Sequence, residues 1–346
     1  GQQRMTTLTL LLIALRDNAI NHPEDTSINS RRIDNMLLKN EYENGDERYK
    51  LLLTENDRDI LIRLVEKKPI PENTVSRLLT NHRFFVEQIE KNELMPAEIY
   101  ESIGKLQIVN ITLDRAVDDA QAIFESLNST GKELSESDLI RNYILMGLEN
   151  DEQSYVYEHF WRPMELMFEY EKQDSVMDKF FRDYLTMKLT RIPKIDKVYE
   201  EFKLYHVNCE FSSVRDLCED LLKYAKYYTD MVFARSSNPV IKNLYVDVND
   251  LRMEVAFPFL LKVHNDCSEG LITEENFIEI LKMCISYVFR RNICDIPTNS
   301  LNKTFATLRN EIKQDDYMNS IKAFFVLRDD YKQFPDDDKF EAAFVS

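Results

Sequence analysis

Helical spacing of apolar residues runs through almost all of the chain after Asn142. Segments with this spacing cover residues 155–167, 180–188, 195–205, 213–234, 251–264, 273–288 and 304–313. Apolar side chains three and four residues apart share one face of a helix, and that face packs into a core. Glycine and proline, which interrupt helices, number only 6 and 10 among 346 residues. The sequence therefore predicts a mostly α-helical, multi-helical chain.

Residues 155–167 contain an aromatic stripe that includes Trp161. Aromatic residues at helical spacing usually pack inside a protein. We therefore interpret this stripe as core and not as part of a cofactor site.

The first 113 residues mix helical and β patterns. Tyr49–Leu53 is short and apolar, and Leu106–Leu113 is rich in β-forming residues, so both segments are predicted strands. Residues 56–66 and 74–91 are predicted helices. His82, on the second of these helices, is expected at the surface, because no second His or Cys lies at a metal-binding spacing.

The amino end of the chain is a candidate anion site. Met5–Leu15 is predicted to be a buried helix, and Gly1, Gln2, Gln3 and Arg4 would lie at its N-terminus. Free backbone N–H groups and the helix dipole attract phosphate there, and an arginine adds a two-pronged hydrogen bond. The alternative is that these four residues are a solvated chain end.

Phe124–Asn142 predicts a second polar site, at a corner between two helices. Residues 120–127 have helical spacing, Asn128–Gly131 would end that helix, and Ser135 would cap the next one. On the second helix Asp138, Arg141 and Asn142 share one face. Either these residues cap and pair within the protein, or they form a pocket for an anionic ligand together with the turn.

The chain has a formal net charge of −17, and an acidic surface repels nucleic-acid backbones. Contact with nucleic acid must therefore be local, and residues 289–313 are the candidate, with five Lys or Arg against two acids. They could contact phosphates, or they could simply end a helix, where cations complement the dipole. The candidate contact residues are Arg290, Arg291, Lys303 and Arg309.

Metal and nuclease chemistry has no support in the sequence. The five cysteines are odd in number and have no metal-ligand spacing, so we interpret them as thiols in a reducing cytoplasm. The five histidines are scattered. Residues 265–270 are expected to form a loop, and its acids lack the spacing of a calcium site. No nuclease centre or metal site is expected, and no apolar run is long enough to span a membrane.

Three stretches resemble the GmrSD-type restriction systems, whose N-terminal module was long called domain of unknown function 262. Phe124–Asn142 fits the family pattern F-x-x-L-N-x-x-G-x-x-L-x-x-x-D-L-I-R-N. Gly1–Leu8 resembles the end of the D-G-Q-Q-R-hydrophobic-T-T-L signature, whose aspartate would precede residue 1. Tyr287–Lys303 resembles a recurrent segment of the family's helical part. The chain is thus interpreted as a fragment of such a protein.

This resemblance implies a small remnant of a ParB-like α/β nucleotide module with inserted helices in residues 1–147, followed by a helical domain in residues 148–346. It implies a nucleoside triphosphate, with Mg²⁺ as accompanying ion, and phage defence in which the nucleotide gates DNA cleavage. The implied nucleotide-binding residues are Gly1, Gln2, Gln3, Arg4, Asn128, Gly131, Asp138, Arg141 and Asn142.

The complete protein would be a modification-dependent endonuclease that acts on DNA, with an HNH nuclease module in cis or in trans. The alternative from a different class is a non-catalytic helical scaffold or protein-interaction module, which also explains the acidity and the scattered histidines.

Overall fold

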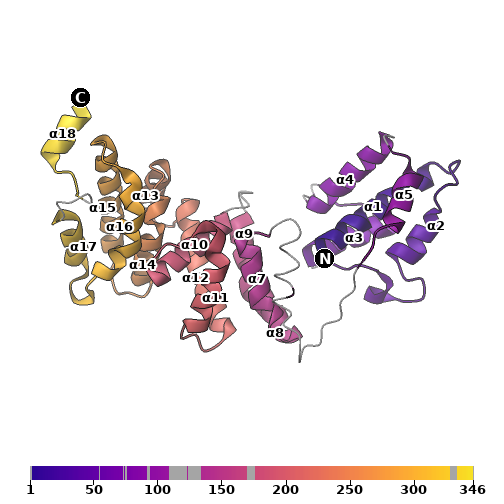
Figure 1. Ribbon diagram of the computed structural model, residues 1–346, viewed down its shortest axis with the longest axis horizontal. Coiled ribbons are helices and arrows are strands. Elements are labelled where there is room, and N and C mark those ends of the chain that lie inside the picture. Colours follow the sequence, from indigo (N-terminus) through magenta and orange to yellow (C-terminus); the bar gives the residue numbers. More distant parts are fainter. Residues whose placement is uncertain are drawn as a thin grey trace. The chain divides into compact units, whose positions relative to one another are not determined.

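The computed structural model describes residues 2–53, 55–72, 74, 76–91, 94–108, 123, 134–169, 176–327 and 333–345. The described chain is mostly helical, as the apolar spacing predicts, and contains no β-strand (Figure 1). None of its helices has the length and apolar character needed to cross a membrane. Contacts divide the chain into two compact units, residues 1–112 and 113–346. The predicted domain division after residue 147 stays a prediction.

The first unit is built around its N-terminal helix, α1 (Gln2–Asn21), which packs against α4 (Arg77–Glu90). The predicted helix over residues 5–15 is therefore confirmed. Leu10, Ile13 and Leu15 of α1 lie in the core of this unit. The other described helices of the unit are α2 (Ser30–Arg32), η1 (Ile33–Leu38), η2 (Gly45–Arg48), α3 (Glu55–Glu66) and α5 (Pro96–Gly104).

A buried arginine joins three elements of the first unit. Arg16 of α1 is 0% exposed. Its guanidinium donates hydrogen bonds to Asp17 (2.9 Å), to Asp34 of η1 (2.8 Å) and to the carbonyls of Leu64 (3.0 Å) and Val65 (2.6 Å) in α3. A buried charge is tolerated when it is paired and its donors are satisfied, and Arg16 meets both conditions.

The strand prediction for Tyr49–Leu53 is wrong. Tyr49 forms an isolated antiparallel bridge with Lys39, and residues 51–53 are irregular, because no neighbouring strand in the described part of the chain offers a ladder. Residues 106–108 of the other predicted strand are also irregular, and residues 109–113 lie outside the described residues.

His82 is not the surface residue that the sequence predicts. It is half-buried on α4, and its enclosed Nε2 atom has no hydrogen-bond partner among the residues that the structure describes. Burial lowers the pKa of this imidazole, which favours the neutral ring. Helical spacing alone did not reveal which face of α4 packs against α1.

The second unit is a stack of helices around one aromatic-rich core. Helix α14 packs against α10, α12 and α16, and Figure 1 shows these helices side by side. Its described elements are α7 (Glu136–Met146), α8 (Asn150–Val156), η3 (Tyr157–Trp161), α9 (Arg162–Glu169), α10 (Val176–Leu189), η4 (Ile195–Lys197), α11 (Val198–Asn208), α12 (Val214–Val232), α13 (Pro239–Asp250), η5 (Glu254–Ala256), α14 (Phe257–Ser268), α15 (Glu274–Ile293), η6 (Thr298–Ser300), α16 (Leu301–Leu308), η7 (Arg309–Glu311), η8 (Gln314–Asp316), α17 (Tyr317–Val326) and α18 (Asp337–Val345).

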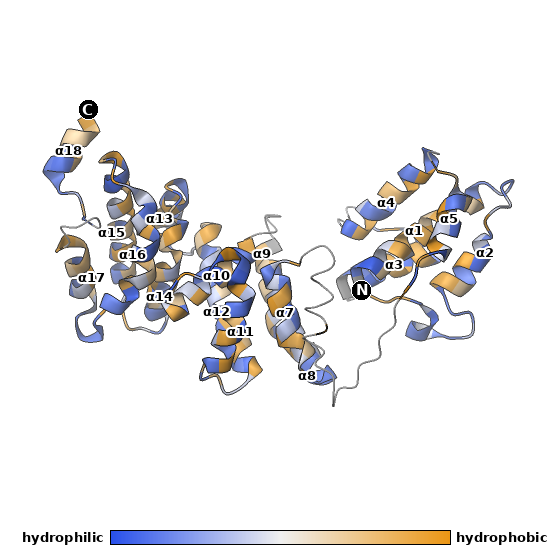
Figure 2. Ribbon diagram, viewed as in Figure 1, coloured by the Kyte–Doolittle hydropathy of each residue, from blue (hydrophilic) through white to orange (hydrophobic). Residues whose placement is uncertain are grey.

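The helices of this unit carry both hydrophilic and hydrophobic residues along their length (Figure 2). Trp161 is 1% exposed and stacks on Phe181 with ring centroids 5.9 Å apart. The interpretation of the stripe around Trp161 as core is therefore confirmed. The five cysteines are free thiols, two of them buried.

The predicted loop at residues 265–270 is partly wrong, because α14 continues to Ser268. Asp266 is buried there, where it accepts a hydrogen bond from the hydroxyl of Tyr317 (2.7 Å) and pairs with Lys262 one turn earlier. These contacts keep the segment helical, although its local composition favours a loop.

Candidate functional site

Helix α7 begins where the sequence predicts. The hydroxyl of Ser135 accepts a hydrogen bond from the backbone N–H of Asp138 (3.1 Å) and contacts its carboxylate (3.0 Å). The backbone N–H of Ser137 donates to Asp178 of α10 (2.8 Å). Protein groups therefore already satisfy these two N–H groups of the first turn. What α7 can offer a ligand is the side-chain face beyond that turn.

Arg141 is the centre of that face. Its Nη1 atom lies 3.0 Å from Oε1 of Glu165 on α9, and its Nη2 atom lies 3.1 Å from Oδ1 of Asp138. The side chains of Arg141, Asp138 and Glu165 are 32%, 36% and 24% exposed. These three residues form a cluster at the surface of the second unit, which we call the Arg141 cluster, and a solute can reach it.

Trp161 contacts the Arg141 cluster from its buried side. Its indole Nε1–H donates to the same Glu165 oxygen, Oε1, at 2.8 Å. Trp161 ends the π-helical segment η3, and Glu165 follows one turn later on α9. Such π-helical turns are frequent at functional sites. The pKa of the neighbouring Tyr157 hydroxyl is raised, by burial first and then by the Glu165 charge.

The charge of the cluster decides which ligands it fits. One guanidinium and two carboxylates give a local net charge of about −1. The cluster as it stands repels a phosphate group, and it fits one only if a carboxylate moves away or a cation accompanies the ligand. Among the described residues, no three His, Cys, Asp or Glu side chains are arranged to hold a metal ion.

The amino end of α1 fits an anion better. The helix begins at Gln2, and Gln3 and Arg4 are exposed in its first turn. No acidic residue lies in that turn, so the positive end of the helix dipole is uncompensated there. Backbone N–H groups and the Arg4 guanidinium are the donors that a phosphate requires.

The predicted nucleotide residues are distributed over both units. Gln2, Gln3 and Arg4 belong to the first unit, whereas Asp138, Arg141 and the half-buried Asn142 belong to the second. The convergence of the two groups on one ligand stays a prediction. Gly1, Asn128 and Gly131 lie outside the described residues.

The basic segment near the end of the chain is largely engaged within the second unit. Arg291 is 0% exposed and donates to the carbonyl of Pro297 at 2.8 Å. Arg290 pairs with Asp337 of α18 at 2.7 Å, and Arg309 donates to the carbonyl of Met187.

Of the four candidate nucleic-acid contacts, Lys303 is exposed, Arg290 and Arg309 are half-buried, and Arg291 is buried. DNA contact through this segment stays a prediction, and Lys303 is the side chain best placed to test it.

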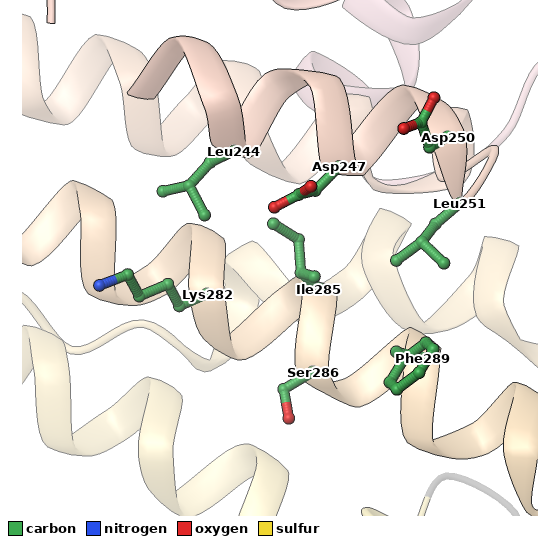
Figure 3. Close-up of a pocket in the computed structure, with 8 residues that line it drawn as sticks. All are labelled: Leu244, Asp247, Asp250, Leu251, Lys282, Ile285, Ser286 and Phe289. Atoms are coloured by element: carbon green, nitrogen blue, oxygen red, sulfur yellow. The ribbon is translucent and has the colours of Figure 1, made fainter. Parts of the chain in front are cut away.

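A separate groove of about 520 Å³ lies between α13 and α15 (Figure 3). Asp247 and Asp250 line it from α13, and Lys282 lines it from α15. Two carboxylates against one ammonium disfavour a phosphate, and none of the predicted nucleotide residues lines this groove. The remaining lining residues are Leu244, Leu251, Ile285, Ser286 and Phe289.

Sequence reasoning missed Glu165 as the partner of Arg141. The two residues are 24 positions apart, and no local spacing connects them. The available signal was the i, i+4 spacing of Trp161 and Glu165, which places an indole N–H next to a carboxylate on one helix face. A buried tryptophan usually needs such a partner.

The comparisons with known proteins support the family resemblance over the first part of the chain, whereas the resemblance of Tyr287–Lys303 stays a prediction. No curated protein matches the chain. Residues 1–145 match the family model described as GmrSD restriction endonuclease, N-terminal domain. The match includes α1 and almost all of α7, the two helices that carry the predicted nucleotide residues. Residues 1–145 of this chain therefore belong to the GmrSD restriction endonuclease N-terminal domain family.

Proposed function

We propose that this chain is the nucleotide-binding regulatory part of a GmrSD-like, modification-dependent restriction protein. The nucleoside triphosphate, with Mg²⁺, regulates DNA cleavage by an HNH nuclease module carried in cis or in trans, and the biological role is phage defence. The observation that carries this proposal is the family match over residues 1–145, which covers both predicted nucleotide motifs.

The proposed roles follow the chemistry of the two sites. The α1 end, with Gln2, Gln3 and Arg4, contacts phosphate oxygens through N–H donors. Asp138 and Arg141 on α7, with the neighbouring Asn142, are the second group of proposed ligand contacts. Gly1, Asn128 and Gly131 complete the proposed set. In this proposal residues 1–147 are the remnant of a ParB-like module, and residues 148–346 connect it to the nuclease.

Nucleotide titration of the full chain tests these roles. We expect Arg4→Ala and Arg141→Ala each to weaken binding of ATP with Mg²⁺ by about tenfold or more, because each removes a charge-assisted hydrogen bond. Isothermal titration calorimetry measures the dissociation constants. The matched control is Arg162→Ala. Arg162 lies about one turn before Glu165, the partner of Arg141, and it pairs with Glu158 at 2.8 Å. Unchanged affinity in both test variants would rule out the assigned roles.

A helical scaffold is the second candidate function. It is favoured by the Arg141 cluster itself, because two carboxylates satisfy the guanidinium without any ligand. This function predicts no nucleotide binding by the full chain. A third role is direct contact with DNA through residues 289–313. Gel retardation tests it: binding of DNA at low salt should weaken when salt is added and in the Lys303→Glu variant.

A further inference from the structure

Glu165 holds two hydrogen-bond donors with one oxygen atom. Arg141 Nη1 (3.0 Å) and Trp161 Nε1 (2.8 Å) both donate to Oε1 of Glu165. The two donors differ in their access to water, because Arg141 is 32% exposed at its side chain and Trp161 is 1% exposed as a residue. Glu165 thus connects a guanidinium that a solute can reach with an indole that it cannot.

Both terminal nitrogens of Arg141 are taken by carboxylates. A guanidinium pairs with carboxylate oxygens and with phosphate oxygens, so a phosphate can compete with either carboxylate for Arg141. Asp138 is further held by the hydroxyl of Ser135 (3.0 Å), within its own helix. Glu165 comes from a different helix, α9, and is the carboxylate that can leave without breaking the cap of α7.

Removal of Glu165 would leave Trp161 without its partner. An unsatisfied buried N–H is costly, so the indole favours the return of the carboxylate whenever no anion is bound. Displacement also brings the local charge from about −1 to about 0, which removes the repulsion that the cluster presents to a phosphate.

We propose that Glu165 competes with a ligand phosphate for Arg141, and that Trp161 senses the exchange. This inference rests on the proposed function, because it assumes that Arg141 contacts the nucleotide. Glu165 is a positioning residue in this proposal: it sets the affinity of the site by occupying Arg141 when no anion is present, and it touches no reacting atom.

Intrinsic fluorescence of the full chain tests the competition, because Trp161 is its single tryptophan. The probes are ATP with Mg²⁺ and, separately, inorganic phosphate. We expect both probes to shift the wild-type emission, the first at lower concentration. Glu165→Gln keeps an oxygen for the indole but loses the ion pair, and we expect it to bind ATP about three- to tenfold more tightly. Arg141→Ala should abolish the ligand-induced shift.

Glu158→Gln is the matched control. It removes a carboxylate two turns earlier on the same continuous helix, where the partner is Arg162 and not Arg141, and its affinity should equal that of the wild type. Far-UV circular dichroism verifies that each variant keeps its helix content.

The possible failures are distinguishable. If Arg141→Ala loses binding but Glu165→Gln binds no more tightly than the wild type, the competition is wrong and the proposed function stands. A nucleotide that binds without moving the Trp161 emission also overturns the inference alone. If neither the wild type nor Glu165→Gln binds either probe, both the proposed function and the competition are wrong.

Discussion

Replacing Arg16 with methionine is expected to lower the free energy of unfolding of the first unit by about 3–5 kcal/mol. Arg16 is 0% exposed, and it donates to Asp17, to Asp34 and to the carbonyls of Leu64 and Val65. Methionine fills a similar volume but removes the buried partner of two carboxylates and the side-chain donor of two carbonyls. The carbonyl of Leu64 still accepts from the backbone N–H of Lys67 (3.4 Å), and Lys39 still pairs with Asp34 (3.0 Å). Each loss carries a desolvation penalty.

Amide hydrogen exchange of α1, η1 and α3 measures the loss of stability in the first unit, where Arg16 makes its hydrogen bonds. Trp161 lies in the second unit, so urea unfolding followed by its fluorescence reports the other core. The matched control is Arg63→Met, since Arg63 of α3 bonds Asp59 at 2.6 Å at the surface and should cost about 0.5 kcal/mol or less. Equal effects of the two substitutions would contradict the role assigned to burial.

Short sequence patterns predicted those features that depend on contacts between residues close together in the chain. The cap of α7 was readable because Ser135 and Asp138 are three residues apart and bond each other. The start of α13 carries an equally local signal that the sequence analysis did not use, since Asn238 caps the helix and Pro239 occupies its first turn.

Long-range contacts explain what the sequence could not predict. Arg16 bonds residues 18 and 49 positions away, and Arg141 bonds one 24 positions away. Arg291 looks like the cationic end of a helix, yet it donates to the carbonyl of Gln333, 42 positions on, and is buried. A charged residue in a sequence therefore indicates which charge a partner must carry. Whether the residue faces solvent depends on the packing of the folded chain.

The carboxyl group of Asp183 in the second unit is expected to make a contribution to stability that is lost as the pH rises from about 4 to about 7. The buried His264 of the same unit, whose pKa burial lowers to about 4, contributes with the opposite sign, so the Asp183 contribution is measured by substitution. Asp183 of α10 is half-buried as a residue, but burial of its carboxyl raises the pKa from 3.8 to about 7. Tyr228 of α12 bonds the carboxyl and, with the charges of Arg182 and Lys179, lowers its pKa, whereas the charge of Glu254 raises it.

The sign follows from proton binding. Between pH 3.8 and about 7 the folded protein holds this proton and the unfolded chain does not, so each added unit of pH favours unfolding. The upper limit is about 4 kcal/mol, at ~1.4 kcal/mol for each unit of pKa difference. Because the residue is partly exposed, we expect about 1–3 kcal/mol. Above pH 7 the carboxyl is charged in both states, and the loss remains constant.

Asp183→Asn should remove this slope, because the amide carries no proton to lose. Urea unfolding of the variant and the wild type, followed by Trp161 fluorescence at pH 4.5 and pH 8, measures the difference. The variant should gain stability relative to the wild type as the pH rises. Glu152→Gln is the opposing control: Arg215 lowers the pKa of Glu152, so that pair stabilises the fold at neutral pH and ceases to do so in acid. If Asp183→Asn leaves the difference between the two pH values unchanged, the carboxyl is not protonated in the folded protein, and the aromatic core around Tyr228 accommodates a charge that burial should exclude.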